Sequence, residues 1–165
     1  MVARLLLLVV LVVVALVAWD SGWKIDESDV HRYYERQEAA IRSFDHESLC
    51  DDVASDFRSV ITSYASGRRV GDDEYDAEGT CRATREVLEG MQALSVRSNG
   101  LVGFDIVVDV RSVRMGPGRR DAMVETITTM KMGEILVARS RGTERLSRAL
   151  WRVRSHGGEG QAWSY

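Results

Sequence analysis

The sequence predicts an α+β fold, in which three helices pack on a curved antiparallel sheet of about four strands behind an N-terminal hydrophobic helix. Two features of the pattern predict it. Between residues 28 and 94, apolar residues recur at the spacing of amphipathic helices. From residue 101, apolar and polar residues alternate as they do in half-buried strands. The 165 residues therefore divide into a hydrophobic segment at 1–24 and one domain at 25–165.

The N-terminal segment has the pattern of a membrane signal. Arg4 is followed by an uncharged, largely aliphatic run from Leu5 to Trp19, which Asp20 ends. A bilayer span takes about 20 residues and a cleavable signal core takes about 7–15, so the run fits either. Leu16-Val17-Ala18 precede Trp19, so a large residue stands where the A-x-A-like cleavage pattern requires a small one, and we expect an uncleaved anchor through residues 2–19 rather than a secretion signal. The charge distribution places the domain outside the cytoplasm, in a bacterial periplasm or at the cell exterior.

The two cysteines, Cys50 and Cys81, bear on the same question of compartment. Outside the cytoplasm thiols tend to oxidise, and both cysteines share a helix face with apolar residues. We therefore expect a disulfide between them, with two buried thiols as the alternative. A metal site is disfavoured because only His46 lies at ligand spacing, and a catalytic thiol is disfavoured by the acidic neighbours of Cys50.

Three helices are expected ahead of the strands. Amphipathic spacing predicts the first over 28–44, with Ser28 as its cap, and the second over 45–65. The polar, glycine-containing stretch "SGRRVGDDEYD" reads as a loop with, at most, a short strand at its centre. Asp76 caps the third helix, which ends near residue 94.

Four strands are expected after residue 101. The first, "LVGFDIVVDVRSV", alternates strictly and ends at the turn "MGPGRR", which holds the only proline. The second covers 121–132, the third covers about 135–148 and the fourth covers 150–165. "GGEG" interrupts the fourth strand, which indicates a bulge or bend.

This order of elements resembles the nuclear transport factor two-like superfamily, which includes ketosteroid isomerases and SnoaL-like cyclases. The resemblance rests on "FDHESLCDDVASDF", on "DAEGTCRATREVLEGM" ahead of long strands, and on Trp151 at the opening of the last strand. It implies a cone-shaped domain over about residues 28–165, with a pocket at the open end of the cone. It also implies a homodimer through the sheet.

The chain offers few candidates for chemistry. Enzymes of that superfamily place Asp, His or Tyr inside the cone, but Asp56, Asp105, Asp109 and His156 are expected at the surface here. No nucleophile elbow, phosphate-binding loop or metal motif is present, so no catalytic residue, metal or cofactor is assigned. Five aromatic residues are candidates for the core or for an apolar pocket: Tyr33, Tyr34, Phe57, Tyr64 and Trp151.

A series of arginines marks the C-terminal strands. The formal net charge of −3 indicates no nucleic-acid partner. The series either covers a solvated sheet face or forms a basic face for anionic lipid or an acidic partner. Its members are Arg139, Arg141, Arg145, Arg148, Arg152 and Arg154.

The function that these features favour is non-catalytic. We expect a single-pass protein of a bacterial inner membrane whose extracytoplasmic domain binds a ligand or acts as a scaffold for an envelope partner. The alternative is a secreted small-molecule isomerase or dehydratase of the same fold. A buried acid–base pair facing an open apolar cavity would favour the enzyme, and a filled cone with an exposed apolar sheet face would favour the scaffold.

Overall fold

The computed structural model describes residues 2–165, with the burial of side chains from Val9 onward. Four α-helices precede or interrupt one sheet: α1 (Val2–Ser21), α2 (Glu27–Arg42), α3 (His46–Asp51) and α4 (Ala77–Arg97). The strands are β1 (Arg58–Ala65), β2 (Arg68–Asp76), β3 (Phe104–Met115), β4 (Asp121–Met132), β5 (Ile135–Ala149) and β6 (Arg152–Ser164). A short 3₁₀ turn, η1 (Pro117–Arg119), joins β3 to β4.

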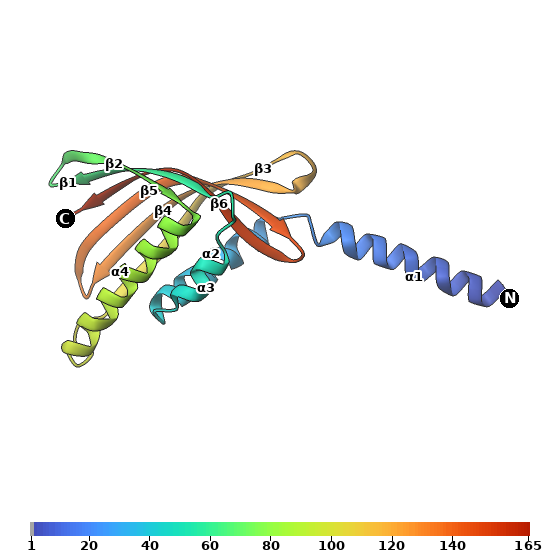
Figure 1. Cartoon of the computed structure of the whole chain (residues 1–165), viewed down its shortest axis with the longest axis horizontal. Helices are drawn as coiled ribbons and strands as arrows, with labels where there is room; N and C mark the ends of the chain where they lie inside the picture. The colour runs from blue at the N-terminus through green and yellow to red at the C-terminus, as the bar shows by residue number, and fades with distance from the viewer. Residues whose placement is uncertain (1) are drawn as a thin grey trace.

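The domain has two layers. The six strands form one sheet in the order β2-β1-β6-β5-β4-β3, and α2, α3 and α4 lie on one face of it (Figure 1). Neighbouring strands are antiparallel except for β1 and β6, which pair in parallel. The expected α+β layout is therefore present, with six strands instead of about four.

The extra strands correct the second predicted helix. Residues 45–65 were expected to form one helix, but α3 ends at Asp51 and residues 58–65 form β1. β1 is rich in β-branched residues, and the polar stretch after it forms β2. Ser66 and Gly67, both with positive φ (50° and 76°), make the tight turn between the two strands. The neighbour that stabilises β1 on its other side is β6, far away in the sequence.

The other predicted helices are confirmed. Asp76 caps α4 as expected, because its side chain accepts a hydrogen bond from the Gly79 N–H. At α2 the cap is Asp26 rather than Ser28: Asp26 and Asp29 form a reciprocal capping box. Asp29 is also buried, and it takes part in an ion pair with β5 that is described below.

Alternation along the strands sorts side chains between the two faces of the sheet, as expected. On β3, Ile106 is buried against the helices, whereas Asp105, Val107 and Asp109 are exposed on the outer face. One cluster of the core joins α2 to β4, β5 and β6 around Val30 and Leu146, and the other joins α3 and α4 to β3. The strand phase therefore decides which residues face the helices.

The predicted bulge in the last strand is present. The β5–β6 register shifts between Glu144 and Leu146, which pair with Gly158 and Ser155. Gly157 has φ +79°, and a Cβ atom there would lie 2.0 Å from the Arg58 carbonyl oxygen. Only glycine therefore allows β1 to approach the bulge this closely.

α1 projects from the domain as a separate helix (Figure 1). Its large apolar side chains from Val9 to Trp19 are each between 53% and 64% exposed. Within the described part of the chain, no helix combines the length and hydropathy that a bilayer span requires.

Candidate functional site: a cavity inside the cone

A cavity of about 570 Å³ lies between the concave face of the sheet and the helices α2, α3 and α4. Its wall is mainly apolar, with Ile41 from α2, Leu88 and Met91 from α4, and Ile106 and Met130 from the sheet. The cone is therefore hollow instead of being filled by its own side chains. A concave, apolar cavity with a few polar groups is the usual form of a small-molecule site.

One carboxyl group lines this apolar cavity. Glu144, on β5, is half-buried and faces the helices because it shares the strand phase of Leu146. The Tyr34 hydroxyl donates a hydrogen bond to Glu144 Oε2 over 2.6 Å, and the Ser155 hydroxyl donates one to Oε1. The carboxyl is thus oriented by α2 on one side and by β6 on the other.

The surroundings of Glu144 change its acidity. Burial raises the pKa of the Glu144 carboxyl above its ordinary value, although the hydrogen bonds from Ser155 and Tyr34 act in the opposite direction. Burial and the nearby carboxylate raise the pKa of both Tyr33 and Tyr34, so both phenols keep their protons. The cavity therefore contains one carboxyl group whose pKa is raised by its burial, which is a feature common among functional acid–base groups.

The sequence pattern did not single out Glu144. The sequence did contain a signal for it. The even-numbered residues of β5 face the helices, and Glu144 places a charged side chain at one of these inward positions. A charged residue on the inward face of a strand is rarely left without a partner or a role. Its partners Tyr34 and Ser155 come from distant elements, so the chain pattern could not supply them.

The aromatic candidates lie in three places. Tyr33 and Phe57 line the cavity, and Tyr34 reaches its polar end through Glu144. Tyr64 is on β1, where its ring stacks on Trp163 with centroids 5.7 Å apart, away from the cavity wall. Trp151 directly precedes β6, as expected of a tryptophan at the opening of the last strand. It belongs to the β5–β6 turn and is 58% exposed, so the expectation that it lies in the core was wrong.

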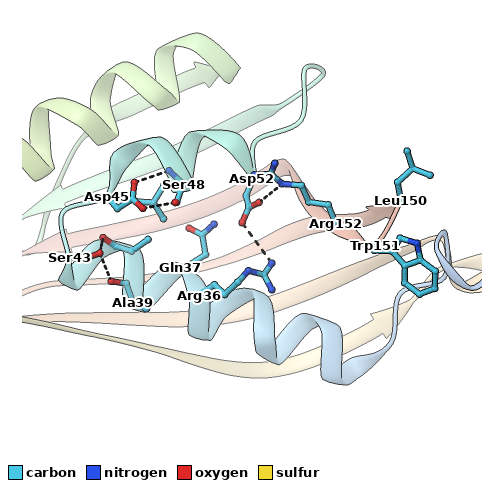
Figure 2. Close-up of a pocket in the computed structure, with 12 residues that line it drawn as sticks. Arg36, Gln37, Ala39, Ser43, Asp45, Ser48, Asp52, Leu150, Trp151 and Arg152 are labelled. Atoms are coloured by element: carbon cyan, nitrogen blue, oxygen red, sulfur yellow. Dashed lines mark hydrogen bonds and ion pairs between the residues drawn. The ribbon is translucent and has the colours of Figure 1, made fainter.

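A second hollow lies outside the cone, between α2, α3 and the β5–β6 turn (Figure 2). Figure 2 shows Asp52 between Arg36 and Arg152, with carboxylate–guanidinium distances of 3.9 Å and 3.0 Å. Asp52 is buried and both of its oxygens are engaged by these arginines. The charges of this hollow therefore neutralise one another and join α2 and α3 to β6.

The arginine series does not form one basic face. Arg139, Arg141 and Arg145 are exposed on the outer face of β5, but Arg141 pairs with Glu125 and Arg145 pairs with Asp56 at 3.4 Å. Side chains alternate between the two faces along a strand, so the even-numbered Arg148 faces the helices, unlike the odd-numbered Arg139, Arg141 and Arg145. Arg148 pairs with buried Asp29 at 2.5 Å. Arg152 pairs with Asp51 and Asp52, and Arg154 is exposed.

A serine, a histidine and an aspartate are linked on the outer face. His156 Nε2 lies 2.7 Å from the Ser147 hydroxyl, and Nδ1 lies 2.6 Å from Asp56. Burial raises the pKa of Asp56, but the hydrogen bond and charge of His156 and the charge of Arg145 outweigh it and keep this pKa below its usual range. The array ties the segment before β1 to β5 and β6, and its three residues line neither the cavity in the cone nor the hollow beside α2 and α3.

The two cysteines are brought together by α3 and α4. Both are half-buried free thiols, and they lie close enough for the Cys81 thiol to affect the pKa of Cys50. Burial, followed by the Cys81 thiol, raises the pKa of the Cys50 thiol to about 12. Among the described residues, no three potential ligands gather as a metal site would require.

No family model and no curated protein matches the sequence. Solved structures do match its fold. The fold is NTF2-like. An NTF2-like protein of unknown function from Shewanella oneidensis is 12% identical over 81% of this chain and 97% of that chain, with a TM-score of 0.55.

Two further structures show the range of proteins that share this NTF2-like fold. The beta subunit of benzoate 1,2-dioxygenase from Burkholderia mallei is 8% identical over 86% of this chain and 92% of its own, with a TM-score of 0.59. An NTF2-like protein from Cytophaga hutchinsonii is 16% identical over 86% of this chain and 100% of its own, with a TM-score of 0.50. At these identities the likeness establishes the fold and not an activity.

Proposed function

We propose that this protein binds a small, largely apolar molecule inside the cone, with Glu144 contacting the polar group of that molecule. The observation that carries this proposal is the Glu144 carboxyl in the wall of a mainly apolar cavity of about 570 Å³. Apolar walls supply affinity through burial, and one fixed polar group supplies orientation. The unfilled cone favours ligand binding over the scaffold, for which a filled cone was expected.

The bicyclic ketone 1-tetralone is a suitable probe, because it is apolar except for one carbonyl oxygen. Equilibrium dialysis should give saturable binding to the wild-type chain. Glu144→Leu removes the polar contact and should weaken binding by about tenfold, the value of one hydrogen bond in an apolar site. Glu144→Gln keeps a donor and should bind nearly as well.

The matched control for these variants is Glu159→Gln. Glu159 is an exposed glutamate on β6 that lines a hollow on the outer face and not the cone cavity. Binding that is unchanged by Glu144→Leu, or that is equally sensitive to Glu159→Gln, would contradict the proposed site.

The second candidate is an isomerase or dehydratase with Glu144 as the acid–base group. It is favoured by the raised pKa of Glu144 and by the fixed orientation that Tyr34 and Ser155 give to its carboxyl. Deuterium exchange at the carbon next to the 1-tetralone carbonyl, followed by NMR in D₂O, separates the two functions. A wild-type acceleration that Glu144→Gln abolishes while binding persists supports the enzyme, and binding without acceleration supports the ligand-binding protein.

The cellular setting is a separate proposal. The domain is tethered to a bacterial inner membrane through residues 2–19 and lies outside the cytoplasm, which the exposed apolar side chains between Val9 and Trp19 support. Retention of the full chain in the membrane fraction after alkaline carbonate washing tests the tether. We also predict a homodimer through the outer face of the sheet and a partner protein in the cell envelope.

A further inference from the structure

Two hairpin tips meet the chain where α1 enters the domain. In the β5–β6 turn, the Trp151 N–H donates a hydrogen bond to the Gly22 carbonyl oxygen over 3.1 Å. Beside the β3–β4 turn, the Ile25 N–H donates one to the Arg119 carbonyl oxygen over 2.7 Å. Figure 1 shows both tips on the side of the domain from which α1 projects. The backbone of both tips therefore contacts the chain at the base of α1.

The β5–β6 tip exposes two large apolar side chains at a strained turn. Leu150 is 60% exposed and Trp151 is 58% exposed. Both have left-handed backbone angles, with φ 49° and 72°, where two-residue turns normally use Asn and Gly. The exposure of apolar side chains and the left-handed backbone angles each lower the stability of the fold. Residues that carry both costs are typical of a functional surface.

The exposed indole rings around the base of α1 are also held in place. The Trp151 ring lies so close to Gly22 that a Cβ atom there would be 3.2 Å from it, and the Arg148 guanidinium lies 5.2 Å from the ring centroid. At the end of α1, Trp19 is 64% exposed and packs against Trp23 with centroids 6.0 Å apart. Indole rings thus flank the base of α1 on the helix and on the domain.

The second tip supplies positive charge. Arg119 and Arg120 are exposed, and neither forms an ion pair with any residue that the structure describes. Of the acidic groups nearby, Asp20 pairs with Lys24 and Asp29 is buried against Arg148. Asp26 caps α2, and the charge of Arg119 contributes to lowering its pKa. Arg119, Arg120 and the half-buried Asp121 form no ion pair with a described residue, so the exposed charges of the tip itself are the two arginines.

We propose that these residues form a collar that rests on an anionic lipid surface. The collar consists of Trp19, Leu150, Trp151, Arg119 and Arg120. Tryptophan favours the boundary between headgroups and acyl chains, leucine adds apolar burial just below it, and arginine pairs with lipid phosphates. The collar is continuous with the exposed apolar surface of α1, which makes a bilayer its matching partner. This inference rests on the proposed tether and adds to it that the domain is docked in one orientation.

The test uses the full chain, labelled with 5-fluorotryptophan, in phosphatidylcholine vesicles with and without phosphatidylglycerol. A fraction of the lipid carries a nitroxide on its headgroup, so that ¹⁹F resonances near the headgroups broaden. The four tryptophans are assigned by Trp→Phe variants. Trp163, which stacks on Tyr64 near the C-terminal end of β6, is the internal control. Figure 1 shows the C-terminus on the side of the domain opposite to α1.

The collar predicts that Trp19 and Trp151 broaden in anionic vesicles and that Trp163 does not. The double variant R119S/R120S should lose most of the Trp151 broadening, whereas the charge-matched variant R68S/R97S, at exposed positions outside the two tips, should keep it. Broadening of Trp19 without Trp151 would overturn the collar and leave the tether intact. If neither resonance broadens, the tether and the collar both fail. Trp151 broadening that R119S/R120S leaves unchanged would contradict the role given to the arginines.

Discussion

Tyr34 donates a 2.6 Å hydrogen bond to Glu144, a residue 110 positions further along the chain. This contact joins the first helix of the domain to the fifth strand at the polar end of the cavity. It orients the one carboxyl group to which the proposed function assigns a role.

The raised pKa of Glu144 predicts how stability depends on pH. Because the folded protein holds this proton more tightly than the unfolded chain, the contribution of Glu144 is fully present below pH 4.5, its ordinary pKa. That contribution is lost as pH rises through the folded pKa. The free energy of unfolding of wild type minus that of Glu144→Gln should therefore fall from pH 4 towards neutral pH in urea titrations. A difference that is flat or rises with pH would show that the carboxyl is not desolvated.

The ion pair between Asp29 and Arg148 should be a major contributor to stability. Both side chains are largely buried, at 6% and 14% exposure, and Arg148 also donates to the Lys24 carbonyl oxygen. Arg148→Met leaves a buried carboxylate with one fewer partner and should cost about 3–5 kcal/mol in urea unfolding.

Arg69→Met is the control for this ion pair, because Arg69 and its partner Asp72 are both exposed. We expect little change in stability from it, since solvent screens such pairs. Equal effects of the two arginine substitutions would show that burial does not govern the Asp29–Arg148 pair.

Gly157 should tolerate no side chain. Its φ of +79° and the 2.0 Å approach to the Arg58 carbonyl both oppose a Cβ atom. Gly157→Ala should therefore lower the free energy of unfolding by more than about 2 kcal/mol. Gly71→Ala is the control, because a Cβ atom there meets nothing within 4 Å. A Gly157→Ala protein as stable as Gly71→Ala would refute the close approach of β1 to the bulge.

The neighbouring thiols of Cys50 and Cys81 should form a disulfide in an oxidising compartment. Closing a loop of about 30 residues should stabilise the domain by roughly 3–4 kcal/mol relative to the reduced protein. Because the pKa of Cys50 is raised to about 12, little thiolate is present at neutral pH, so oxidation should be slow without a catalyst.

Intact mass after alkylation without reductant measures this pairing, in protein from the periplasm and from the cytoplasm. Full alkylation of both samples would contradict the disulfide. The double variant C50S/C81S gives the stability of the unbridged domain.

The sequence predicted the elements whose pattern is local. β3 alternates from Phe104 to Val110, and α4 begins at Asp76, so both were recognised. β1 was missed because Val60, Ile61 and Tyr64 fit a helical spacing as well as a strand. The strand is favoured by its parallel pairing with β6, and a contact so distant in the sequence cannot be predicted from a local pattern.

The candidate site was predicted only in part. Tyr33 and Phe57 line the cavity because apolar aromatic residues on inward faces tend to surround a core or a pocket. Trp151 was misplaced because a tryptophan normally indicates burial, whereas here the turn geometry exposes it. Glu144 was overlooked because its partners Tyr34 and Ser155 come together only in the folded chain.

The most direct test of the central claim is a methyl NMR titration of the full chain with 1-tetralone. The chain has six methionines, which are labelled at their methyl carbons. Met91 and Met130 line the cavity, whereas Met115 lies at the exposed end of β3. The account predicts saturable shifts and ligand contacts at Met91 and Met130 and none at Met115. Unchanged Met91 and Met130 resonances at saturating 1-tetralone, or shifts confined to Met115, would contradict a ligand site inside the cone.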